Sequence, residues 1–275
     1  MNAIILALYA AAGLIYCLHF ARRDPAVGRA ATTVLLLAAV AHTFVIGMQT
    51  MEVRHVPFAN PSRFVSTFVW LLTLSYLYVE LTTDERAMGI FIIPIAVALQ
   101  TIPAIYPGVE NADPVLDSAW FWVHVSSLLF AYASFALAAM LGLTYMLQFK
   151  EIKKKHLGYL YTRLPSLQIL DAMNSRAVAI GWLFLTIGVV VGVVWTAQAS
   201  ALAPDDPNLR AMSLNDPKIF IAVLTWAIYS FAVFARRTLG WTGRRAAWLS
   251  ALGFAIVLLN VLPVTYFVTT SHTFQ

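Results

Sequence analysis

Long apolar stretches alternate with short polar segments along the whole chain. A bilayer core about 30 Å thick requires roughly 20 apolar residues in helical form, and this criterion predicts about eight transmembrane helices. They cover residues 2–20, 31–50, 63–82, 88–106, 119–148, 177–200, 218–235 and 246–270. Proline, glycine or charged residues mark the breaks between them. The pattern therefore predicts an all-α fold, a polytopic membrane helical bundle formed as a single integral membrane domain over residues 1–275.

The composition agrees with a membrane protein and excludes a water-soluble one. Of the 275 residues, 60% are hydrophobic and 11% are charged, and the mean hydropathy is +0.76. An ordinary soluble domain is far less apolar. The net charge of +5 does not indicate a nucleic-acid partner, because the Lys and Arg residues lie in short segments between apolar stretches.

The distribution of charge between the polar segments predicts an orientation. Residues 149–176 and 236–245 are rich in Lys and Arg, whereas residues 107–118 and 201–217 carry mainly acidic side chains. Short basic loops stay on the cytoplasmic side of a membrane. We therefore expect the basic segments inside, the acidic segments outside and both chain termini outside, in a multi-pass protein of the bacterial inner (plasma) membrane.

Histidines are the residues with the clearest chemical potential, because ionisable groups within membrane spans are costly and mark functional sites by default. Four of the six fall near the predicted outer face: His42, His55, His124 and His272. A neutral imidazole is the usual axial ligand of haem iron, and Trp120 and Trp122 beside His124 could line an aromatic cleft. Tryptophans also anchor helices at membrane interfaces whatever the function, and both interpretations of these two residues stay open.

Other features favour structural roles. No nucleotide-binding loop, HExxH motif or nucleophile elbow occurs, which argues against an ATPase, a hydride-transfer enzyme or a membrane protease. Independent catalysis is therefore not expected. Glu80 lies near the end of a predicted span, where we expect it to be interfacial. The small residues Gly181, Gly188 and Gly192 predict close packing of a neighbouring helix.

Several short segments, in order along the chain, resemble one family of membrane proteins. They are His55 to Asn60, the Trp122-Val123-His124-Val125 stretch, Arg163-Leu164-Pro165-Ser166-Leu167, Asp216-Pro217-Lys218 with Leu224-Thr225-Trp226, and Ser271-His272. Together they are similar to the integral-membrane cytochrome c assembly family, which includes the CcsA/ResC proteins and their HemX-like relatives. The resemblance covers most of the chain from about residue 50 onward.

The resemblance implies a site for haem b near the outer face, with His124 and His272 as axial ligands of the iron. His42 is the rival ligand because it lies at nearly the depth of His124. The chain also departs from the family pattern, since Asn215 and Ile219 replace a Trp and a Glu around the Asp-Pro-Lys segment. Phe234 stands where active synthases carry a histidine. What remains resembles the HemX-like branch, which lacks the Trp-rich loop.

The expected function is therefore haem binding in haem handling or cytochrome c maturation. The expected partners are haem, membrane lipid and either another cytochrome c biogenesis membrane protein or apocytochrome c. The alternative is a non-catalytic structural or regulatory membrane subunit, in haem biosynthesis or a respiratory complex.

Overall fold

The structure, a computed structural model, describes residues 1–53, 60–106, 108, 119–155, 158–202 and 217–259. Its regular elements in these ranges are all helices, and the prediction of an all-α fold is confirmed. A helix pairs most of its backbone N–H and C=O groups internally, which is what a lipid environment demands of a spanning segment.

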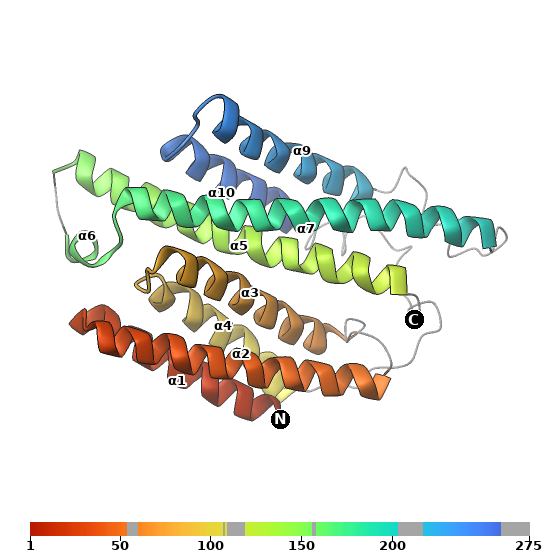
Figure 1. Cartoon of the computed structure of the whole chain (residues 1–275), viewed down its shortest axis with the longest axis horizontal. Helices are drawn as coiled ribbons and strands as arrows, with labels where there is room; N and C mark the ends of the chain where they lie inside the picture. The colour runs from red at the N-terminus through yellow and green to blue at the C-terminus, as the bar shows by residue number, and fades with distance from the viewer. Residues whose placement is uncertain (54–59, 107, 109–118, 156–157, 203–216, 260–275) are drawn as a thin grey trace.

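The first half of the chain forms one group of four helices. The group comprises α1 (Asn2–Arg22), α2 (Pro25–Val53), α3 (Pro61–Thr83) and α4 (Gly89–Ile105). Figure 1 shows them running side by side, with α1 packed against α2 and α4 and with α3 packed against α2 and α4.

The second half forms another group of long helices. It comprises α5 (Ala119–Lys153), α7 (Leu167–Leu202), α9 (Pro217–Thr238) and α10 (Arg244–Leu259), with the short α6 (Tyr159–Arg163) before α7. The pair α5 and α7 packs most extensively, and α10 lies against α5 and α9. The two groups meet where α3 packs against α5 and α7 (Figure 1).

The polar turns lie at the two ends of the helical bundle. We call one the basic end, because the α1–α2 turn with Arg22 and Arg23 lies there beside the segment that precedes α7. Arg163 of that segment donates hydrogen bonds to the carbonyl oxygens of Phe20 and Ala21. At the opposite end, the Asn2 amide donates to the Pro103 carbonyl over 2.9 Å. The helices therefore alternate in direction, as the charge pattern requires.

Local sequence explains where α3 begins and ends. The Asn60 side chain accepts a hydrogen bond from the Ser62 amide at 2.8 Å, and Pro61 occupies the first helical position. At its other end, Asp84 adopts a left-handed conformation with φ 53°, which stops the helix and starts the turn toward α4. This turn carries Arg86 to the basic end.

Six of the described helices are long and apolar enough to span a membrane. The α4 helix has 17 residues, and α10 is described for 16 residues up to Leu259. The count of eight spans and the external position of both termini therefore stay predictions. The helices α5 and α7 extend past the predicted 119–148 and 177–200, because polar residues continue a helix beyond the stretch that hydropathy identifies.

The orientation can be tested with single cysteines in a Cys17→Ala background. Asn111 lies in the acidic segment after α4, outside the described residues, and the exposed Gly158 lies between α5 and α6 at the basic end. In intact cells, Asn111→Cys should react with a membrane-impermeant thiol reagent and Gly158→Cys should react only after permeabilisation. The reverse labelling pattern would invert the topology.

Candidate functional site

The imidazole of His124 is held between two helices. His124 lies five residues after the start of α5 at the end opposite the basic end, and its Nδ1 is 2.7 Å from the carbonyl oxygen of Gly188 on α7. The side chain is half-buried. Because the Gly188 carbonyl can only accept, the Nδ1 atom carries the proton in this hydrogen bond.

Two glycines of α7 create the space that this ring occupies. A Cβ at Gly192 would lie 2.5 Å from Cε1 and Nδ1 of His124, and a Cβ at Gly188 would lie 2.8 Å from Leu128. Gly181, further along α7, makes the same kind of room for the Phe135 ring of α5. The predicted close packing at Gly181, Gly188 and Gly192 is thus confirmed, and α5 is the helix that uses it.

The hydrogen bond fixes which nitrogen of His124 is available. With the proton on Nδ1, a neutral imidazole keeps its lone pair on Nε2. Metal-binding histidines commonly donate their other ring N–H to a backbone carbonyl, which sets the tautomer and orients the ring. The hydrogen bond of His124 thus has the same form, and it leaves the lone pair of the neutral ring on Nε2.

Aromatic side chains surround this part of α5. The rings of Phe121 on α5 and Trp195 on α7 are 5.3 Å apart, close to the level of His124. Trp120 is exposed and Trp122 is half-buried. Phe121 and Trp195 cover the same junction of α5 and α7 as His124, and so an apolar ligand beside Nε2 would meet aromatic surface.

His42 has a different environment. It is completely buried in the first helical group, where its Nδ1 is 3.0 Å from the Tyr9 hydroxyl of α1 and its Nε2 is 3.0 Å from the Ser66 hydroxyl of α3. Gln100 of α4 also donates to Ser66, at 3.3 Å. Both ring nitrogens of His42 are therefore engaged, and binding a metal would require one of these bonds to break.

Of the four predicted histidines, the structure describes His42 and His124, and it places them in different surroundings. His42 is hydrogen-bonded within the first helical group and His124 across to α7, while His55 and His272 lie outside the described residues. Within the described ranges, no group of three or more His, Cys, Asp or Glu side chains could hold a metal ion. A haem iron needs fewer protein ligands than such a cluster, and two imidazoles suffice.

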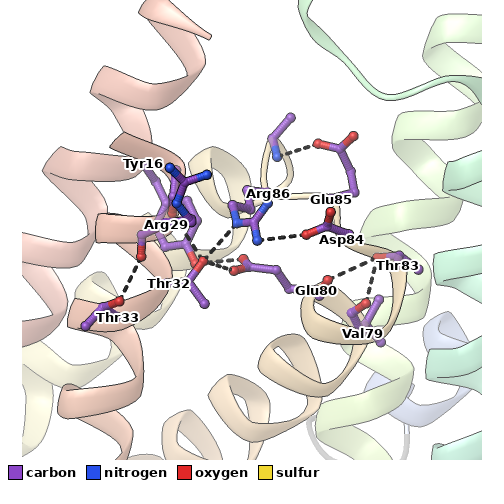
Figure 2. A network of polar contacts seen from close by, with 12 residues as sticks. Tyr16, Arg29, Thr32, Thr33, Val79, Glu80, Thr83, Asp84, Glu85 and Arg86 are labelled. Atoms are coloured by element: carbon purple, nitrogen blue, oxygen red, sulfur yellow. Dashed lines mark hydrogen bonds and ion pairs between the residues drawn. The ribbon is translucent and has the colours of Figure 1, made fainter. Parts of the chain in front are cut away.

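Glu80, which we expect to be interfacial from its place near the end of a span, is buried between helices. Its side chain is 1% exposed and accepts hydrogen bonds from Tyr16 of α1 and Thr32 of α2, as Figure 2 shows. Distance along α3 places Glu80 near the membrane surface, but α1 and α2 cover it from the side. Hydroxyl residues at similar depth on two neighbouring spans are the sequence signal that could have revealed this burial.

The long apolar helices define a polytopic α-helical membrane protein. Comparison with known proteins identifies its family. A model of the cytochrome C assembly protein family matches residues 5–272. The chain belongs to this family, and it is a membrane protein of cytochrome c biogenesis.

Individual relatives agree with this assignment. The chain is similar to the cytochrome c biogenesis protein CcsA of Guillardia theta, with 27% identity over 259 residues that cover 87% of this chain and 83% of that protein. Its similarity to CcsA of Trieres chinensis is 25% over 263 residues, covering 84% and 81%. For CcsA of Synechococcus elongatus it is 25% over 286 residues, covering 87% and 84%.

Replacing Gly192 with Ala should displace the His124 ring. The new methyl group would occupy the space of Cε1 and Nδ1, so the bond to the Gly188 carbonyl should be lost at a cost of about 1–3 kcal/mol in stability. Gly181→Ala is the matched control, because it crowds Phe135 instead. Both variants should lower the thermal midpoint in detergent, but only Gly192→Ala should change the ¹⁵N chemical shifts of His124. Unchanged shifts would show that the ring does not depend on Gly192.

Replacing His42 with Ala should destabilise the first helical group. The substitution removes the imidazole that bonds the Tyr9 and Ser66 hydroxyls and opens a cavity, which together cost about 3 kcal/mol. His124→Ala should cost less, because that ring is half-buried. Denaturation of the two purified variants measures the difference, and equal losses would contradict a structural role specific to His42.

Proposed function

We propose that this protein binds haem b non-covalently near the outer membrane face and acts in haem handling or cytochrome c maturation, with His124 as one axial ligand. The observation that carries the proposal is the hydrogen bond from Nδ1 of His124 to the Gly188 carbonyl, which leaves Nε2 free to bind iron. Membership of the cytochrome c assembly family supports haem as the ligand.

The described residues around His124 fit one face of a haem. A neutral imidazole with an unprotonated Nε2 matches the iron, and Phe121 and Trp195 offer apolar contact to the macrocycle. Trp120 and Trp122, on the same turns of α5, are the further candidates for contact with the ring. Haem bound here would supply the iron and the vinyl groups to which the thiols of an apocytochrome add. The chain itself would hold and orient it.

The second axial ligand in this proposal is His272. The family resemblance assigns it this role, and His55 is the other candidate outside the described residues. His42 is the less suitable rival, because both of its ring nitrogens already have hydrogen-bond partners in the first helical group.

The departures from the family pattern favour haem handling over complete synthase activity. Asn215 and Ile219 replace residues that the Trp-rich loop of a synthase would present, which supports assignment to the HemX-like branch. An apocytochrome c or another cytochrome c biogenesis membrane protein would then receive the haem. The basic segments support a location in the bacterial inner membrane with the haem site outside.

The second candidate function is a non-catalytic structural or regulatory subunit. Phe234 favours it, because this residue stands on α9 where an active synthase carries histidine, and its side chain is exposed on the helix surface. No imidazole is available at that position for an inner haem. The haem content of the purified protein distinguishes the two functions, since a structural subunit would contain none.

Absorption spectra of detergent-purified protein test the ligand assignment. Two axial imidazoles should give a six-coordinate, low-spin spectrum. Both His124→Ala and His272→Ala should give five-coordinate or weakly held haem, while the control His19→Ala, at the basic end, should leave the spectrum unchanged. If His272→Ala keeps the native spectrum and His42→Ala abolishes it, the axial pair is His42 with His124.

Complementation tests the role in maturation. Expressed alone in a strain that lacks its cytochrome c synthase, this protein should restore less holocytochrome c than a synthase with an intact Trp-rich loop, because Asn215 and Ile219 replace residues of that loop. Full rescue, measured by haem staining of the c-type cytochromes, would show that these tryptophans are dispensable and that the HemX-like assignment is wrong.

A further inference from the structure

A buried carboxylate in the first helical group is bonded by hydroxyl groups from two other helices. The Tyr16 hydroxyl of α1 donates to Oε2 of Glu80 at 2.7 Å, and the Thr32 hydroxyl of α2 donates to Oε1 at 2.5 Å (Figure 2). Glu80 lies on α3, so the carboxylate connects three helices near the basic end. An ionisable group inside a membrane protein is a candidate functional site by default.

Arg86 connects this carboxylate to the surface of the basic end. Its Nε donates to Oγ1 of Thr32 at 3.2 Å, and its Nη2 pairs at 2.8 Å with Asp84, whose side chain is 84% exposed. In the described part of the chain, Glu80 has no direct ion pair with a cationic side chain. The positive charge therefore reaches Glu80 only through the Thr32 hydroxyl, and its attraction for the ionised carboxylate is correspondingly weaker.

The hydrogen bonds around Glu80 can satisfy either protonation state. Oγ1 of Thr32 is also 3.2 Å from the carbonyl oxygen of Gly28, one turn earlier on α2. When Glu80 is ionised, Thr32 donates to it. When Glu80 is protonated, Glu80 can donate to Thr32, which then turns its own hydrogen toward the Gly28 carbonyl. Tyr16 donates to Oε2 in both states, so no buried group loses its partner.

We propose that Glu80 is a proton-binding site that exchanges protons with water at the basic end of the bundle. In the binding step, a hydronium ion in this water breaks one O–H bond and becomes water. Its proton forms the O–H bond on Oε1 of Glu80, and the Thr32 hydroxyl reorients toward Gly28. Release reverses both changes and returns the proton to the same water. This proposal does not depend on haem binding, because neither His42 nor His124 contacts the network.

The groups that face Glu80 set its charge balance. They are Tyr16 from α1, Thr32 from α2, Tyr76 from α3 itself and Arg86 from the turn before α4. No charged side chain of α5 or α7 forms a hydrogen bond or ion pair with Glu80 among the described residues. Charge-assisted hydrogen bonds are about twice as strong as neutral ones, and so α1 and α2 are held to α3 more firmly when Glu80 is ionised.

Infrared difference spectroscopy of the full-length protein in lipid nanodiscs detects the proposed proton. Lowering the pH should produce the carbonyl stretching band of a protonated, buried carboxyl group, and raising the pH should remove it. Glu80→Gln should abolish this band. Glu85→Gln is the matched control, because it makes the same chemical change on the neighbouring turn, where Glu85 bonds the Ala87 amide.

A threonine pair keeps the test decisive if Glu80→Gln does not fold. Thr32→Val removes the hydroxyl that bonds the ionised carboxylate and should raise the proton affinity of Glu80 about tenfold, or about one pH unit at the midpoint of the band. Thr33→Val is the control, since the Thr33 hydroxyl bonds the Arg29 carbonyl of its own helix and no other described residue. It should leave the midpoint unchanged.

Three results would overturn the proposal. No carboxyl band in the unmodified protein, over the pH range in which it stays folded, would mean that Glu80 only links the three helices. A band that persists in Glu80→Gln would belong to another carboxyl group. Equal midpoints in Thr32→Val and Thr33→Val would show that Thr32 takes no part in proton binding.

Discussion

The distance between α5 and α7 is the constraint on which the candidate site depends. In a membrane, helices do not associate through the hydrophobic effect, and close contact requires small residues that let two backbones approach. Gly188 and Gly192 supply this contact, and the same approach brings a backbone carbonyl within 2.7 Å of His124. The packing of the two helices and the tautomer of the imidazole therefore have one cause.

The first helical group depends on polar side chains instead. Its interior contains His42 between Tyr9 and Ser66, and Glu80 between Tyr16 and Thr32. Such groups are costly to bury without partners, but they give each helix a single acceptable rotation against its neighbours. The two halves of the protein thus use different means of assembly. Glycine contacts fix α5 against α7, and hydrogen-bonded networks fix α1, α2 and α3.

The sequence predicts the helices well because bilayer thickness sets the length of an apolar stretch, and the glycines of α7 already indicate close packing. It does not predict which neighbour a polar residue meets. Depth along α3 suggests an interfacial Glu80, but its burial depends on Tyr16 and Thr32, which are far away in the chain. Motif analysis likewise cannot single out the Gly188 carbonyl, because every residue carries the same backbone group. Residue types indicate His124 as a candidate, and only the packing of α7 identifies the nitrogen it offers.

The lengths of α5 and α7 relate the site to the thickness of the membrane. With 35 and 36 residues, these helices are about 52–54 Å long at 1.5 Å per residue, whereas a bilayer with its headgroups measures about 40–45 Å. A rigid pair of this length must tilt or project into water. His124 lies within the first two turns of α5, so projection at that end would carry it out of the hydrocarbon and to the level of the headgroups. In a thinner bilayer His124 would project further from the membrane. Lipid composition would then influence how readily a water-soluble protein reaches the imidazole.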